Sequence, residues 1–159
     1  MLLLIDAGNT RIKWALAESH HRVGEWHATG SALHAELETL EQTWSGHTIT
    51  HVVISNVAGD AIASTLKTML LALGVPERSM QWFRAQAHSG GVRNTYQQPT
   101  QLGSDRFASL IGARHRYGDQ RLLVVTCGTA TTVDALEADG TFSGGMILPG
   151  LATLSLIHI

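Results

Sequence analysis

The sequence predicts an α/β fold, and three observations support this prediction. Residues 2–5 and 51–55 are strongly apolar runs of strand length, as expected of buried strands. Segments with apolar residues at helical spacing alternate with strand-like runs in the middle of the chain. A strand–turn–strand pattern at the N-terminus recurs about 120 residues later, which is typical of a duplicated domain.

The elements expected in the first half follow from periodicity and from stop signals. Ile12, Trp14 and Leu16 alternate with other residues and predict a strand. Ser31 is expected to cap a helix that ends at Gly46. In chain order, strands are expected at 2–5, 12–16, 23–29, 51–55 and 81–84, and helices at 31–45 and 60–73.

The second half begins with an aperiodic segment, residues 86–102, which is expected to form a long surface loop. A helix is then expected at 104–117, because apolar residues recur at helical intervals and Gly118 follows. Further strands are expected at 121–125, 131–136 and 141–143, with a hairpin turn at 138–140.

Composition is typical of a folded globular protein. The chain has 159 residues, of which 44% are hydrophobic and 15% charged, with 3 prolines, so a disordered or fibrous protein does not fit. A net charge of −2 does not indicate the excess of basic residues that is typical of proteins that bind nucleic acid or an anionic membrane. The single cysteine, Cys127, excludes an intramolecular disulfide. We therefore expect a cytoplasmic protein with no nucleic-acid or membrane partner.

The repeat consists of two hairpins that overlay without a gap, residues 2–16 on residues 122–136, with Gly8 on Gly128. Glycine in such a turn lets an anion approach the backbone N–H groups. Two such turns facing each other would hold an oligophosphate from both sides. The alternative for either segment alone is a plain hairpin turn. Neither segment is a P-loop or a dinucleotide-binding fingerprint.

Four motifs, in the same order, resemble those of the type III pantothenate kinases, a family that includes the Bvg accessory factor proteins. They are DAGNTRIK at 6–13, GSDR at 103–106, GTA at 128–130 and GGMILPG at 144–150. The resemblance implies an actin-like, Hsp70-like ATPase fold of the ribonuclease H-like class, duplicated, with the second copy incomplete. It also implies ATP-dependent phosphorylation of pantothenate as the first step of coenzyme A synthesis. Mg²⁺, a monovalent cation (K⁺ or NH₄⁺) and a homodimer are implied as well.

The resemblance also implies roles for single residues. Asp105 is implied as the catalytic base, and the alternative is a first-turn carboxylate of the following helix. The implied substrate contacts are Tyr96, Gly103, Ser104, Asp105 and Arg106, and the implied nucleotide contacts are Asp6, Ala7, Gly8, Asn9, Thr10, Arg11, Ile12, Lys13 and Thr129. Asp6 is the candidate to hold Mg²⁺ through water. Thr126 replaces an aspartate with which many members bind the monovalent cation, so that site stays unassigned.

The expected domains are residues 1–102, an actin-like ATPase domain, and residues 103–159, the catalytic helix with the start of a second such domain. A complete second copy would need on the order of 100 more residues. We therefore interpret the chain as C-terminally truncated, and expect its exposed apolar edge to make it poorly stable alone. Two alternatives remain open: a nucleotide-binding accessory protein without kinase activity, and another kinase of the same fold. The 9 histidines lack the spacing of a zinc site.

Overall fold

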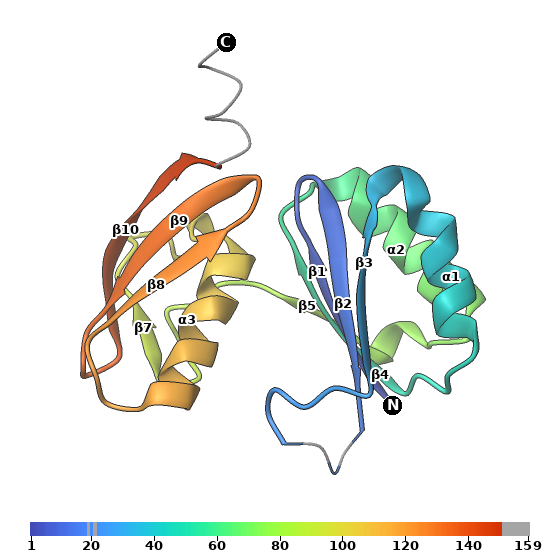
Figure 1. The fold of residues 1–159 in the computed structure, drawn as a ribbon, viewed down its shortest axis with the longest axis horizontal. Coiled ribbons are helices and arrows are strands. Elements are labelled where there is room, and N and C mark those ends of the chain that lie inside the picture. Colours follow the sequence, from blue (N-terminus) through green and yellow to red (C-terminus); the bar gives the residue numbers. More distant parts are fainter. Residues whose placement is uncertain (19, 21, 151–159) are drawn as a thin grey trace. The chain divides into compact units, whose positions relative to one another are not determined.

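The computed structural model describes residues 1–18, 20 and 22–150, and these form two compact units (Figure 1). The first unit is Met1–Phe83 and the second is Arg84–Ile159. The described residues of each unit build a five-stranded sheet with helices, which confirms the α/β class. The domain boundary expected between residues 102 and 103 stays a prediction, and the apolar tail at 151–159 lies outside the described residues.

The sheet of the first unit has the strand order β3-β2-β1-β4-β5. Its strands are β1 (Leu2–Ala7), β2 (Arg11–Ala17), β3 (Ala28–Leu33), β4 (His51–Asn56) and β5 (Met80–Phe83). β2 runs antiparallel to both β1 and β3, whereas β4 runs parallel to β1, and β5 to β4. β1 is therefore the central strand, paired on both sides.

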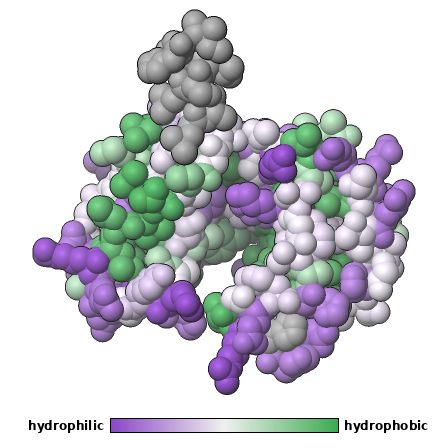
Figure 2. Space-filling view, viewed as in Figure 1, coloured by the Kyte–Doolittle hydropathy of each residue, from purple (hydrophilic) through white to green (hydrophobic). Residues whose placement is uncertain are grey.

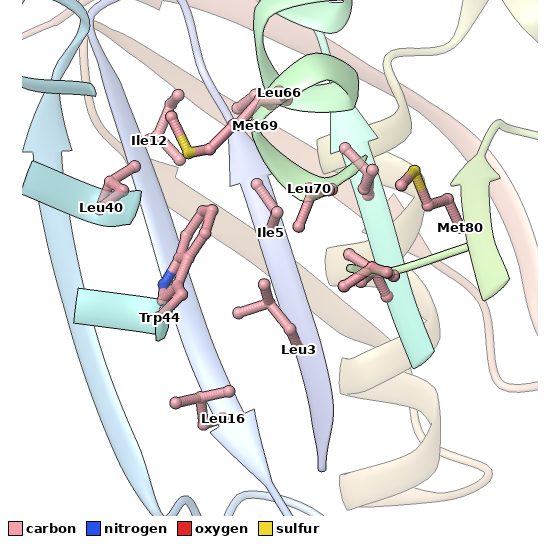
Figure 3. Close-up of a cluster of buried hydrophobic side chains, with 14 of the residues drawn as sticks. Leu3, Ile5, Ile12, Leu16, Leu40, Trp44, Leu66, Met69, Leu70 and Met80 are labelled. Carbon is pink, nitrogen blue, oxygen red and sulfur yellow. The ribbon is translucent and has the colours of Figure 1, made fainter. Parts of the chain in front are cut away.

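Two helices, α1 (Leu37–Ser45) and α2 (Asp60–Ala72), cover one face of this sheet (Figures 1 and 3). The short helices η1 (His34–Glu36) and η2 (Glu77–Ser79) precede α1 and β5. Figure 3 shows Leu3 and Ile5 of β1 pointing toward Trp44 of α1 and Leu70 of α2, and all four side chains are buried. Burial of apolar side chains of this size contributes about 1.5–3 kcal/mol each, so this face is the core of the unit.

Two expectations about the segment between β2 and α1 were wrong. The third strand is Ala28–Leu33, not 23–29, and Ser31 lies inside it instead of capping a helix. The strand is placed by Gly30, which lies opposite Trp14, because a Cβ there would come within 2.7 Å of the indole ring. The helical segment begins after Leu33, whose N–H donates to Glu36 Oε2 at 3.0 Å.

The sheet of the second unit has the order β6-β7-β10-β9-β8. Its elements are β6 (His88–Ser89), β7 (Val92–Asn94), η3 (Pro99–Gln101), α3 (Ser104–Tyr117), β8 (Leu122–Cys127), β9 (Ala130–Leu136) and β10 (Thr141–Pro149). β8, β9 and β10 form an antiparallel meander, and β10 also pairs in parallel with β7. The helix expected at 104–117 is confirmed to the residue.

The expectation of a long loop at 86–102 was wrong, because the segment contains two short strands and a 3₁₀ turn. Val92, Asn94 and Leu102 are buried in it. Strands of two and three residues are too short to show an alternating pattern in a sequence, so periodicity alone did not reveal them.

The second sheet is covered by α3 on one face and exposed on the other. Leu136 and Phe142 are buried together with Phe107 of α3. On the opposite face, Leu123 is 72% exposed and Val125 55%. β10 adds the exposed side chains of Met146, in register with Val125 across Val133, and of Leu148. Figure 2 shows hydrophobic side chains gathered at the surface of this unit. No helix within the described residues is long and apolar enough to cross a membrane.

The ungapped overlay of the two hairpins holds for their first strands but not for their second strands. Ala7 pairs with Ile12 across the first turn, whereas Cys127 pairs with Thr131 across the second, which is one residue shorter. Leu16 therefore corresponds in register to Ala135, not to Leu136. The second strands nevertheless bury the same overlaid positions, Ile12 and Leu16 in one copy and Thr132 and Leu136 in the other. A shift of one residue in pairing moves side chains to the other face of a sheet, so the difference in burial falls on the first strands.

We expect equivalent residues of the two first strands to differ in their contribution to stability. Leu3 is fully buried and Leu123 is 72% exposed. Leu3→Ala should lower the free energy of unfolding by about 2–5 kcal/mol, and Leu123→Ala by less than about 0.5 kcal/mol. Urea unfolding followed by circular dichroism measures both variants, and tryptophan fluorescence reports on the first unit, which contains all 4 tryptophans. Equal losses would show that Leu123 is covered in solution.

Candidate functional site

The first phosphate motif forms the end of β1, a tight turn and the start of β2. Asp6 and Lys13 are cross-strand partners, and Lys13 Nζ lies 3.9 Å from Asp6 Oδ2. The Gly8 N–H donates to the Arg11 carbonyl at 3.0 Å and closes the turn, whose residues Asn9, Thr10 and Arg11 are exposed. The structure therefore places a carboxylate, an ammonium group and a polar turn at one end of the sheet of the first unit.

Two residues of the same motif face the core. Ala7 and Ile12 are fully buried beneath the helices of the first unit. Their side chains hold the turn in place, and only their backbone groups can meet a ligand.

A residue that sequence reasoning missed supports this turn. His34 of η1 contacts the Gly8 carbonyl with Nε2 at 2.8 Å. A carbonyl oxygen only accepts hydrogen bonds, so Nε2 carries the proton and donates it. His34 is one of 9 histidines and shows no motif. Its sequence separation of 26 residues from Gly8 explains why no local pattern could identify it.

The second predicted turn lies between β8 and β9 and is exposed. The Gly128 N–H donates to the Ala130 carbonyl at 3.0 Å, and the Gly150 N–H donates to the Thr129 carbonyl at 3.1 Å. A Cβ at Gly150 would collide with the carbonyl oxygens of this turn, which gives the last glycine of the 144–150 motif a physical reason. Thr126 stands at the exposed end of β8, opposite Thr132.

The substrate motif forms the first turn of α3. Gly103 is the N-cap, and its carbonyl accepts the Phe107 N–H at 3.0 Å. Ser104 and Arg106 are buried, and Asp105 between them is half-buried. Asp105 Oδ1 accepts the N–H of Arg106 at 2.8 Å, a contact within the first turn of the helix, where a carboxylate is favoured. This contact fixes the orientation of the carboxylate.

Arg106 is held by Asp134 of β9, which sequence reasoning also missed. Arg106 Nε lies 3.2 Å from both carboxylate oxygens of Asp134, and Nη2 donates to Oδ1. The side chains are 9% and 1% exposed. The hydrogen bonds to Asp134 raise the pKa of the Arg106 guanidinium, although burial acts in the opposite direction, and Tyr96 raises it further. Arg106 therefore carries its charge at neutral pH.

Aromatic side chains surround this pair. The guanidinium carbon of Arg106 lies 5.9 Å from the centre of the Phe142 ring, and the Tyr96 ring lies 5.6 Å from the same centre. Within the second unit, the structure thus brings together Tyr96 and Arg106, two of the predicted substrate contacts, and adds Asp134 and Phe142. An aspartate inside an expected strand was the available signal for Asp134, since a buried carboxylate needs a cationic partner.

The described residues contain no group of three or more His, Cys, Asp or Glu side chains that could hold a metal ion. Asp6 is a single carboxylate whose side chain is 43% exposed. Mg²⁺ in phosphoryl-transfer sites takes one or two carboxylates, with phosphate oxygens and water completing its shell. A single, partly exposed carboxylate beside the predicted phosphate turn therefore fits this ion.

Comparison with known proteins decides the family. Residues 2–156 match the family described as type III pantothenate kinase. The chain belongs to this family. It is 52% identical to the type III pantothenate kinase of Herminiimonas arsenicoxydans and 51% identical to that of Janthinobacterium sp. (strain Marseille). Each match covers 98% of this chain and 61% of the relative, so the chain spans about three-fifths of the length of these curated pantothenate kinases.

Solved structures with the same fold are more distant in sequence. A Ppx/GppA phosphatase of Aquifex aeolicus, in its type II variant, matches with a TM-score of 0.53 and 10% identity over 98% of this chain and 54% of its own. A structure of the Aquifex aeolicus PPX-GPPA enzyme matches with a TM-score of 0.52 and 14% identity, and the match covers 98% and 55% of the two chains. The likeness concerns the fold alone. It agrees with the expected actin-like, Hsp70-like fold, and this chain spans about half the length of each neighbour.

We expect the buried ion pair of this pantothenate kinase family member to be needed for stability. Arg106→Ala leaves the Asp134 carboxylate buried without its cationic partner, which costs about 3–5 kcal/mol of unfolding free energy. Arg121→Ala is the matched control, because Arg121 pairs with Glu137 at 3.0 Å but is 85% exposed, and it should leave stability nearly unchanged. Urea unfolding of both variants measures the difference. Equal stability of the two variants would contradict the assignment.

Proposed function

We propose that the full-length protein containing this chain transfers the γ-phosphoryl group of ATP to the hydroxyl of pantothenate and forms 4′-phosphopantothenate. The observation that carries the proposal is the match to type III pantothenate kinases at about 50% identity over nearly the whole chain. Asp6, Asp105 and Arg106, to which the family resemblance gives roles, are all present and lie at strand or helix ends.

In this proposal, the first unit binds the phosphates of the nucleotide through backbone N–H groups and a positive charge. Lys13 and the exposed turn at 8–11 have the chemistry for phosphate oxygens, and His34 keeps the turn closed. Asp6 would hold Mg²⁺ through water, and the bound ion would neutralise charge on the phosphates. Thr129 in the second turn supplies a further hydroxyl and backbone groups.

The second unit supplies the acceptor site in this proposal. Tyr96, Gly103, Ser104 and Arg106 would contact pantothenate. Asp105 would accept the proton of the pantothenate hydroxyl. At the same time the hydroxyl oxygen would bond to the γ-phosphorus of ATP, and the bond between the γ-phosphorus and the leaving ADP oxygen would break. The contact between Asp105 Oδ1 and the Arg106 N–H supports this role, because it orients the carboxylate before substrate binds.

The proposal also includes a monovalent cation, K⁺ or NH₄⁺, a homodimer and a cytoplasmic location. Their support is the family resemblance. Thr126 offers a neutral hydroxyl where a carboxylate is common, so the ligands of the cation are not assigned.

A coupled assay for ADP release, with ATP, pantothenate, Mg²⁺ and either K⁺ or NH₄⁺, tests the proposed function on the full-length protein. We expect turnover that depends on pantothenate. Absence of turnover with both cations would contradict the kinase assignment and would favour an accessory protein that only binds nucleotide. Sugars in place of pantothenate distinguish another kinase of the same fold.

Asp105→Asn is expected to lower turnover by about 10²–10⁴-fold, because the amide cannot accept the hydroxyl proton. ATP affinity, measured by calorimetry, should stay within about twofold, since a general base acts on the acceptor. Asp119→Asn is the control, an exposed carboxylate paired with Arg114 near the far end of α3. A comparable loss of ATP affinity in Asp105→Asn would show that Asp105 is not mainly the base.

His34→Ala is expected to weaken ATP binding about fivefold, the equivalent of one hydrogen bond of about 1 kcal/mol, because the Gly8 turn loses its support. The KM for pantothenate should not change. His51→Ala serves as the control, since this exposed histidine lies at the other end of β4 from Ser55, which pairs with Asp6. Unchanged ATP affinity in His34→Ala would remove His34 from the nucleotide site.

A further inference from the structure

Asp134 is a buried charge within β9, and the proposed mechanism does not use it. Its carboxylate is 1% exposed, and both oxygens contact Arg106. Replacing a buried ion pair with apolar residues of similar volume is often neutral or stabilising, so stability alone gives a weak reason for such a pair. A role for the charge itself is the better explanation where one partner lies in a predicted substrate site.

The geometry of the contact determines which way the guanidinium points. A guanidinium is planar and carries its N–H donors in a fixed arrangement. Asp134 binds the edge of the guanidinium that carries Nε and Nη2. This contact fixes the plane of the guanidinium and thereby the direction of the N–H groups on Nη1. Tyr96, another predicted substrate contact, and this guanidinium both lie against the ring of Phe142. Arg106 is therefore bound to an internal carboxylate on one edge and lies near a residue of the predicted acceptor site.

Gly145 leaves the space that this contact needs. It is the cross-strand partner of Asp134 on β10. A Cβ at Gly145 would collide with Asp134 Oδ1, and would lie 2.7 Å from the Val133 carbonyl and 2.8 Å from Arg106 Nη2. Its φ angle is not positive, so space and not backbone freedom explains the glycine. This residue of the 144–150 motif is thus tied to the ion pair.

A second polar group lies on the same face of β9. Thr132 precedes Asp134 by two residues, is 8% exposed, and points to the same side of the sheet. Within the described part of the chain, its hydroxyl has no hydrogen-bond partner. Buried hydroxyls are almost always paired in folded proteins, so this group points to a ligand atom close to Asp134.

We propose that Asp134 is a positioning residue of the acceptor site, which fixes the guanidinium plane of Arg106 so that its remaining N–H groups meet oxygen atoms of the acceptor, with Gly145 keeping the space for the contact. The proposal rests on the proposed pantothenate kinase function. It assigns to Asp134 no contact with the substrate and no proton transfer.

The test uses steady-state kinetics of the full-length protein with two variants. Asp134→Asn keeps the shape but turns an amide N–H₂ toward the guanidinium, and Asp134→Glu keeps the charge but moves its carboxylate by one methylene. We expect each to raise the pantothenate KM at least about tenfold, because small displacements of a positioning group cost that much or more. The ATP KM should stay within about twofold. Asp139→Asn is the control, an exposed carboxylate near Arg93, and should behave as wild type.

A double variant separates positioning from an independent role. If Asp134 acts only through Arg106, then Asp134→Asn adds no further increase in pantothenate KM to Arg106→Ala. A folded Asp134 variant with wild-type pantothenate KM, equal increases in both KM values, or an additive double variant would each overturn the proposal. So would failure of both Asp134 variants to fold, checked by thermal melting, because Asp134 would then be structural. If wild type itself turns over no pantothenate, the proposed function fails first and this inference with it.

Discussion

Alternate residues of a strand face opposite sides of its sheet, and this constraint decides what each half of the repeat buries. Leu3 and Ile5 of β1 face α1 and α2 and form the centre of the first core. The corresponding Leu123 and Val125 of β8 alternate in the same way, but in the second unit the described residues place a helix only on the opposite face. The same strand pattern therefore gives a core in one unit and an exposed apolar face in the other.

The two hairpins place their charged residues differently. In the second unit, the side chains of Thr132, Asp134 and Leu136 are buried on one face of β9. Asp134 meets Arg106, the third residue of α3. In the first hairpin the register puts Lys13 beside Asp6 at the exposed end of the strands. The first copy thus has its charged pair, Asp6 and Lys13, at the surface beside a turn. In the second copy, Asp134 and its partner Arg106 are buried.

Sequence reasoning succeeded where a single local signal was strong. The helices at Asp60–Ala72 and Ser104–Tyr117 have long apolar periods followed by Gly74 and Gly118, and the structure agrees with them closely. It failed at Ala28–Leu33, where the deciding contact is Gly30 against Trp14 across the sheet. The short strands at 88–94 are likewise determined by pairing with distant residues. Local patterns predict elements that stabilise themselves, and long-range packing determines the others.

The same distinction applies to the candidate site. The motif residues with predicted ligand contacts stand in turns or near the ends of strands and helices, where a ligand can reach the backbone or a polar side chain. His34 and Asp134 support them from 26 and 28 residues away in sequence, and neither belongs to a motif. A hydrogen bond to a carbonyl and a buried ion pair produce no periodic pattern in the sequence, so only the fold reveals them. Gly145 is the exception, since a glycine at mid-strand already indicates that something must approach the backbone closely.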